Sequence, residues 1–325
     1  MSSTVNNVES NDHINSDHID SPIKDNRYNT LSAKIIEIIE SSNSLPWSRP
    51  WTIDYSRGSI SGTESNLSTG KFYSGVNTII LGWIRQVTPS YRPYWIGYNQ
   101  CKSLIKEGNC SVNKGSKGYP IFYPKLYKDI DTNGNEYMKL SGFGVSYVFN
   151  IAQTNYNLDL LDVKPVDTTE EVKTPSTIIE CEDVINRYKN HPIISEVGNE
   201  AVYYPSLDCI HMPNRTQFKS LSCYYKTLYH ELTHSTGHQS RLNRPLKGHS
   251  DKLSYSNEEL IAEFGSCFLS SITKINCEDD DIRNSAGYIA SWKKYIKADP
   301  MCLPKAAGAA EKAVKFMLNG INEVS

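Results

Sequence analysis

The residues with the clearest chemical potential are two histidines and a glutamate in the sequence H-E-L-T-H at 230–234. On a helix, His230 and His234 project from the same face, so one nitrogen of each ring can reach the same zinc ion. Glu231 would lie beside the metal, placed to take a proton from bound water and pass it to a leaving amine. The motif therefore predicts a zinc peptidase, with Zn2+ as cofactor and Glu231 as the catalytic residue.

A third ligand must come from another part of the chain. His238 is close in sequence, but the spacing HExxHxxGxxH would need a histidine where this chain has Ser240. The better source is E-E-L-I-A-E at 258–263, because Glu259 and Glu263 are four residues apart and share one helix face. One can bind zinc while the other accepts a hydrogen bond from a ligand histidine. We predict Glu259 as the ligand, as in gluzincins, with Glu263 or His238 as supporting residues or alternative ligands.

Helices must position these side chains. The pattern predicts one helix over 222–236, which carries the histidine pair, and a second over 256–273, which carries the glutamates. Ser256 or Asn257 would cap the second helix. Other elements expected in this half are a short hairpin within 202–212 and helices at 285–297 and 304–319.

The composition divides the chain into four segments. Residues 1–26 are rich in Ser, Asn and Asp and are expected to be a disordered tail. Residues 27–154 form an aromatic-rich domain, in which a helix is predicted at 30–41 and strands at 118–128 and 143–151. Residues 155–177 have no periodicity and are predicted to be a linker. Residues 178–325 are predicted to form a mostly helical domain that contains the metal motif.

The aromatic-rich domain has the composition of a single-stranded DNA-binding surface. Residues 27–150 contain 14 Lys and Arg against 8 Asp and Glu, although the whole chain has a net charge of −2. Basic grooves interleaved with aromatic rings bind single strands because the bases stack on the rings. Lys114 and Lys117 lie on a Gly-rich turn that could approach phosphates. The aromatic candidates, all in Gly/Pro-rich contexts, are Trp47, Trp51, Tyr73, Trp95 and Tyr98. The alternative is a tryptophan-rich core, to which Trp83 would belong.

Location and redox state follow from simpler features. No run of about 18 apolar residues is present, so no membrane span is predicted. The polar N-terminus resembles neither a signal peptide nor a transit peptide, so a cytoplasmic location is expected. The 8 cysteines form no CxxC pair and are expected to be reduced, mostly buried thiols.

Several sequence blocks resemble ArdC-type antirestriction proteins. YYKTLYHELTHSTGHQSRLNR (224–244), EELIAEFGSC and NSAGYIASWKKYIKADP (284–300) are similar to that family's peptidase domain. PWSRPW (46–51), STGKFYSGVN (68–77), PYWIGYNQ (93–100), NKGSKGYPIFYP (113–124) and VFNIAQT (148–154) are similar to its N-terminal single-stranded DNA-binding domain. The resemblance implies an α+β protein, in which a mixed α/β DNA-binding domain precedes a mainly helical, zincin-like domain. It also adds Lys71 and Asn77 to the candidate DNA contacts.

Three functions remain open at this point. The first is a zinc peptidase that binds single-stranded DNA and cleaves a protein substrate associated with that DNA. The second is an antirestriction protein that only coats single strands and whose zinc has no catalytic role. The third is a cytosolic peptidase whose first domain is a substrate adaptor. A structural zinc usually has four protein ligands, and the three found here favour the first function.

Overall fold

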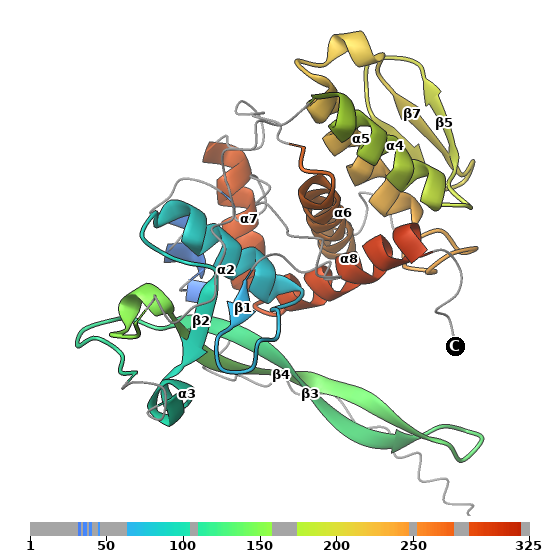
Figure 1. Ribbon diagram of the computed structural model, residues 1–325. Coiled ribbons are helices and arrows are strands. Elements are labelled where there is room, and N and C mark those ends of the chain that lie inside the picture. Colours follow the sequence, from blue (N-terminus) through green and yellow to red (C-terminus); the bar gives the residue numbers. More distant parts are fainter. Residues whose placement is uncertain are drawn as a thin grey trace, which may run out of the picture.

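The computed structural model describes residues 64–104, 110–157, 174–246, 252–275 and 286–319, and several residues between 32 and 45. A four-stranded sheet lies in the N-terminal half, and a three-stranded sheet with long helices lies in the C-terminal half (Figure 1). The protein is therefore of the α+β class. The predicted tail and the tryptophans at 47 and 51 lie outside the described residues.

The N-terminal sheet has the strand order β1-β2-β4-β3. Strand β1 (Ser65–Asn66) is parallel to β2 (Tyr94–Gly97), which pairs antiparallel with β4 (Glu136–Asn150). Helix α2 (Val76–Val87) is largely apolar and buries Trp83, as the sequence predicted. The short helix α3 (Tyr98–Ser103) begins directly after β2.

Strand β3 (Tyr119–Ile130) and β4 form a long antiparallel hairpin that extends away from the rest of the molecule (Figure 1). Both strands extend past the predicted ranges, because the Asp/Asn-rich segment between them forms the turn of the hairpin. Gly134 occupies the left-handed region there, with φ of 85°. Closer to the body, the ring of Tyr123 lies directly over Gly144, where any Cβ would overlap it.

The C-terminal sheet has the strand order β5-β7-β6. Strand β5 (Ile193–Glu196) is parallel to β7 (Cys209–Met212), and β6 (Val202–Tyr204) is antiparallel to it, which confirms the predicted hairpin. The helices of this half are α4 (Thr174–Arg187), α5 (Leu221–Ser235), α6 (Lys252–Ile272), α7 (Ala286–Ala298) and α8 (Cys302–Asn319). Helix α6 begins four residues before Ser256, so the predicted cap at Ser256 or Asn257 is wrong: both residues lie inside the helix.

One hydrophobic cluster joins the two halves. It contains Ile79 of α2 and Trp95 of β2 together with Leu260 and Phe264 of α6. Helix α8 lies between these groups and packs against both α6 and α2 (Figure 1). Several of its buried side chains are alanines, which allow the neighbouring helices to approach closely at those positions. These fully buried alanines are Ala306, Ala307, Ala310 and Ala313.

The structure corrects the prediction that all the cysteines are reduced. Cys101 of α3 and Cys110 form a disulfide, and their Cα atoms lie 5.2 Å apart. Cys223 is also disulfide-bonded. Cys181, Cys267 and Cys302 are buried free thiols, as expected, and Cys209 is a partly exposed one.

No helix within the described ranges combines the length and the apolar character that crossing a membrane would require.

Candidate metal centre

Helix α5 holds the two histidines on a buried surface. Ser220 caps its first turn, where the Ser220 hydroxyl accepts a hydrogen bond from the Cys223 amide at 3.3 Å. Both histidines lie near the C-terminal end of the helix, one turn apart. The spacing brings the Nε2 atoms of His230 and His234 to within 3.1 Å of each other.

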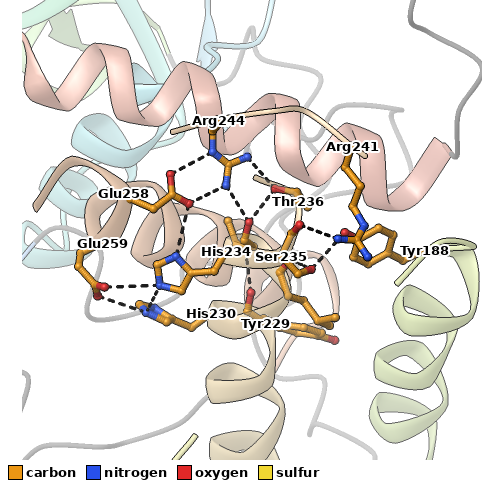
Figure 2. Close-up of polar contacts among 12 residues, drawn as sticks. Tyr188, Tyr229, His230, His234, Ser235, Thr236, Arg241, Arg244, Glu258 and Glu259 are labelled. Carbon is orange, nitrogen blue, oxygen red and sulfur yellow. Dashed lines mark hydrogen bonds and ion pairs between the residues drawn. The ribbon is translucent and has the colours of Figure 1, made fainter. Parts of the chain in front are cut away.

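Helix α6 supplies a carboxylate to the same point. The Glu259 oxygens lie 3.5 Å from Nε2 of His230 and 3.6 Å from Nε2 of His234 (Figure 2). Within the described part of the chain, these three residues form the one cluster of His, Cys, Asp or Glu side chains able to share a metal ion.

The close approach of the two helices depends on a glycine. A Cβ on Gly265 of α6 would lie 2.4 Å from the hydroxyl oxygen of Thr233 in α5. Thr233 lies between the two histidines in the sequence and is fully buried. Its hydroxyl donates a hydrogen bond to the Tyr229 carbonyl at 2.7 Å. Gly265 therefore lets α6 come near enough for Glu259 to reach the histidines.

A glutamate and an arginine orient His234 from the Nδ1 side of its ring, which faces away from the other ligands. Nδ1 of His234 lies 3.4 Å from Oε1 of Glu258, so a proton on Nδ1 points at the carboxylate and leaves Nε2 free for a metal. Arg244 grips the same carboxylate with two hydrogen bonds, from Nη2 at 2.7 Å and from Nε at 3.1 Å. Arg244 also donates to Thr236 and to the Thr233 carbonyl, which ties it to the end of α5 (Figure 2).

Glu263 is not the supporting acid, which corrects the sequence prediction. It is buried, but one turn further along α6, in a region that faces an earlier part of α5. Ser266 nearby donates to the Lys226 carbonyl at 2.6 Å, and the charges of Lys226 and Glu263 both act on Cys267. The way α5 and α6 pack together thus places Glu258, rather than Glu263, against His234.

The charges around the site fit a cationic ligand. Burial acts to lower the pKa of His234, but the hydrogen bond to Glu258 and the charges of Glu231, Glu259 and Glu258 raise it above its usual value. Burial likewise acts to raise the pKa of Glu258, but His234 and Arg244 hold it below its usual range. The carboxylates therefore favour positive charge at this point.

The donor set fits a divalent metal. A tetrahedral zinc site, with bonds of about 2.0–2.2 Å, has ligand atoms roughly 3.3–3.5 Å apart. The three separations here are 3.1, 3.5 and 3.6 Å. Two imidazole nitrogens and one carboxylate are also the ligand set of the His2Glu zinc peptidases.

Glu231 is held next to this cluster by the neighbouring sheet. It is only 8% exposed, and its Oε2 accepts a hydrogen bond from the Tyr203 amide of β6 at 2.8 Å. This contact uses one carboxylate oxygen, and the other can exchange a proton with a reacting group.

His238 lies apart from the cluster. Its Nδ1 is 2.7 Å from the Ser240 hydroxyl oxygen. With Arg244 and residues of the turn between β6 and β7, it lines an open pocket of about 290 Å3. The structure therefore does not bring His238 to the metal ligands.

The predicted DNA contacts divide into exposed and buried groups. Tyr98 is 51% exposed, and Lys71, Lys114 and Lys117 are exposed as well. Trp95 is fully buried and Tyr73 is 9% exposed, so neither ring can stack on a base, which corrects both predictions.

Long-range contacts explain the buried residues. The Trp95 indole N–H donates to Glu64, which also accepts from Arg85 at 2.6 Å. Asn77 forms two hydrogen bonds of 2.7 Å with the backbone of Phe122, which ties α2 to β3 and commits its amide to the fold. These bonds give Asn77 a structural role, and its DNA contact stays a prediction.

Two family models match separate parts of the chain. The N-terminal domain of anti-restriction factor ArdC matches residues 25–149, and a zincin-like metallopeptidase model matches residues 181–309. The metal-free crystal structure of the antirestriction ArdC protein from plasmid R388 is 30% identical, with a TM-score of 0.61, over 89% of this chain and 96% of that one. The chain belongs to the ArdC family of antirestriction proteins.

The chain is also similar to a metal-bound ArdC structure and to part of a longer protein. The Mn(II)-bound structure of the R388 ArdC protein is 31% identical, with a TM-score of 0.63, over 92% of this chain and 99% of that one. DNA primase TraC of Escherichia coli is 30% identical over 303 residues, which make up 89% of this chain and 26% of TraC. The chain thus spans about a quarter of the length of this curated relative.

Sequence reasoning missed two residues of this ArdC-family site. Glu258 is adjacent to Glu259, and the E-E pair at the start of the motif is the only local signal of a second acid. Nothing local in the sequence indicates Arg244, because it reaches Glu258 only through the turn that follows α5.

Proposed function

We propose that the protein is a zinc-dependent peptidase that binds single-stranded DNA and cleaves proteins associated with that DNA. The observation that carries the peptidase assignment is the convergence of His230, His234 and Glu259, with Glu231 fixed beside them. The zincin-like domain and the Mn(II)-bound ArdC structure support a divalent metal at this point.

The side chains have separate tasks in this proposal. His230, His234 and Glu259 would hold the zinc ion, which would act as a Lewis acid and activate water at neutral pH. Glu231 would accept the proton of the attacking water and return it to the leaving amine. The Tyr203 amide keeps the Glu231 carboxylate in one orientation, and Glu258 with Arg244 keeps His234 in the tautomer that binds metal.

The number of ligands favours catalysis over a structural role for the metal. A structural zinc normally has four protein ligands, whereas the cluster found among the described residues has three. The remaining position would be open to water and substrate. This weighs against the function of a DNA-coating protein with an inert zinc.

The DNA part of the proposal rests on the exposed residues of the N-terminal half. Tyr98, Lys71, Lys114 and Lys117 combine a ring with positive charge on the surface. This composition suits a single-stranded polyanion better than it suits an adaptor for protein substrates.

The test is metal content and casein cleavage by the full-length protein, with and without single-stranded DNA. We expect about one zinc per chain. Glu231→Gln should keep the zinc and lose the cleavage, because only the proton acceptor is removed. Glu200→Gln, the same change at an exposed position, should behave like the original protein.

Two results would count against the proposal. Undiminished cleavage by Glu231→Gln would remove the assigned base. Full zinc content in both His230→Ala and His234→Ala would show that the metal binds elsewhere.

A further inference from the structure

The N-terminal half has a small aromatic and basic surface on the far side of the molecule from α5 and β7 (Figure 1). It is built from α3, the end of β4 and the loop before β3. We call it the α3 patch, and it contains Tyr98, Lys102, Lys117, Tyr147 and Phe149.

Two of its residues come from one turn of helix α3. Tyr98 is the first residue of the helix and is 51% exposed. Lys102 follows one turn later, and its Nζ lies 4.5 Å from the centroid of the Tyr98 ring. The ammonium group is therefore held over a surface ring, where it is close to anything that stacks nearby.

Strand β4 adds two more rings beside Tyr98. Phe149 is half-buried, and its ring centroid is 6.5 Å from that of Tyr98, with 55° between the planes. Tyr147 is two residues earlier, so it points to the same face of the strand. It is 47% exposed.

The lysine-bearing loop packs against these rings. A Cβ on Gly118 would lie 3.2 Å from both the Phe149 ring and Cβ of Tyr147, so the loop runs in contact with β4 at this point. Gln153 fixes the loop with a hydrogen bond of 3.0 Å to the Lys117 carbonyl. The backbone of Lys117, whose side chain is exposed, is thus anchored close to the aromatic group.

The charged side chains described in this part of the chain, away from the hairpin tip, have one sign. The described residues between 94 and 128 include five lysines and no Asp or Glu, and those between 137 and 157 add one lysine and no acid. The acidic residues of the hairpin lie at its tip, at Asp129, Asp131 and Glu136. The patch therefore suits a polyanion.

A small core holds the patch in place from below. Ile96, Cys101 and Cys110 form a separate buried cluster, onto which Leu104 and Val112 pack. The disulfide between Cys101 and Cys110 joins α3 to the chain that leads into the lysine loop. The rings are therefore presented by a cross-linked support, which reduces the ordering cost of binding.

We propose that single-stranded DNA binds the α3 patch, with bases stacked on Tyr98 and Tyr147 and phosphates paired with Lys102 and Lys117. This inference rests on the proposed function and assigns its DNA site. Unpaired bases are required because a duplex hides the faces that would stack on the rings. The DNA would lie away from the metal centre and would leave it open to a protein substrate.

The test is the affinity of the full-length protein, without reductant, for a labelled deoxythymidine strand of about 15 nucleotides. Tyr98→Ala and Tyr147→Ala should each weaken binding by about 5- to 150-fold, the range measured for loss of a stacked base. Tyr98→Phe should bind almost normally, since it keeps the ring. Lys102→Gln should reduce the slope of log affinity against log salt by about 0.7.

Tyr137→Ala is the matched control, because Tyr137 is on the same strand, is 44% exposed and lies near the hairpin tip. It should bind like the original protein. If the original protein binds single strands but the Tyr98 and Tyr147 variants bind equally well, the patch assignment is wrong and the proposed function stands. If the original protein binds no single-stranded DNA, the DNA part of the proposed function fails as well. If the original protein bound duplex DNA as tightly as single-stranded DNA, the proposal that bases stack on Tyr98 and Tyr147 would be wrong.

Discussion

The adjacent residues Glu258 and Glu259 have different tasks at the start of α6. Glu259 points at the two Nε2 atoms, whereas Glu258 points at Nδ1 of His234 and is gripped by Arg244 (Figure 2). Neighbouring residues on a helix project about 100° apart. One E-E pair can therefore supply both a metal ligand and the carboxylate that orients a ligand histidine. His234 and the partly buried Arg244 hold the pKa of Glu258 below its usual range, so the carboxylate favours a proton on Nδ1 of His234, away from the metal.

This division of tasks predicts an order of metal affinities. Glu259→Ala should weaken zinc binding most, since it removes a ligand. Glu258→Gln should weaken it by about 10- to 100-fold, because only the orientation of His234 is lost. Glu263→Gln, the control, should have the smallest effect, as measured by competition with a chromogenic chelator at a temperature where all the variants are folded. A larger loss for Glu263→Gln than for Glu258→Gln would contradict the assignment.

The packing of helix α6 against helix α5 brings the ligands of the metal centre together. Each helix carries part of the ligand set, and neither can bind the metal with three ligands alone. At Gly265 the backbone of α6 lies against Thr233 of α5, which fills the space where a Cβ would be.

Gly265→Ala should therefore separate the helices. Strain of this kind costs about 1–3 kcal/mol, and movement of Glu259 away from the histidines should lower zinc affinity at the same time. Gly308→Ala is the control, because an added Cβ in α8 meets nothing within 4 Å. It should leave zinc binding unchanged and raise stability by up to about 1 kcal/mol. Calorimetry and zinc titration would measure both effects, and normal zinc affinity in Gly265→Ala would contradict this role.

At the scale of the whole molecule, the two halves share one core through α8. The helix presents fully buried alanines between α6 and α2, and the hydrophobic cluster runs from Ile79 to Leu260 without a break. Helix α3, which carries the α3 patch, and helix α5, which carries the two histidines, are thus on opposite sides of one packed body (Figure 1). We expect the described halves to unfold together.

Ala310→Leu tests this shared core. The extra side chain has no space at a position that is 0% exposed, so it should cost about 1–3 kcal/mol. The transition should stay single, whether followed by helical circular dichroism or by tryptophan fluorescence. Lys312→Leu introduces the same residue at an exposed site on α8 and should change stability little. Two separate transitions in the original protein would show that the halves fold independently.

The sequence by itself determined the features that depend on local geometry. The spacing of His230 and His234 brings them together on any helix, and the hairpin strands followed from their β-branched and aromatic residues. Glu259 was within reach of prediction because it belongs to the acidic helix motif at 258–263, which follows the histidines closely in sequence.

Only the tertiary structure decided the features that depend on how distant segments meet. Glu258 replaces Glu263 because of the way α5 and α6 pack, which no spacing in either helix encodes. Trp95 and Tyr98 are three residues apart with similar local context, yet one is buried against Glu64 and the other lies on the surface. The Trp95 ring packs against Tyr91 and Tyr119, which lie in other segments of the chain, whereas Tyr98 begins the surface helix α3. The Cys101–Cys110 disulfide likewise depends on a tertiary arrangement that places the two Cα atoms 5.2 Å apart.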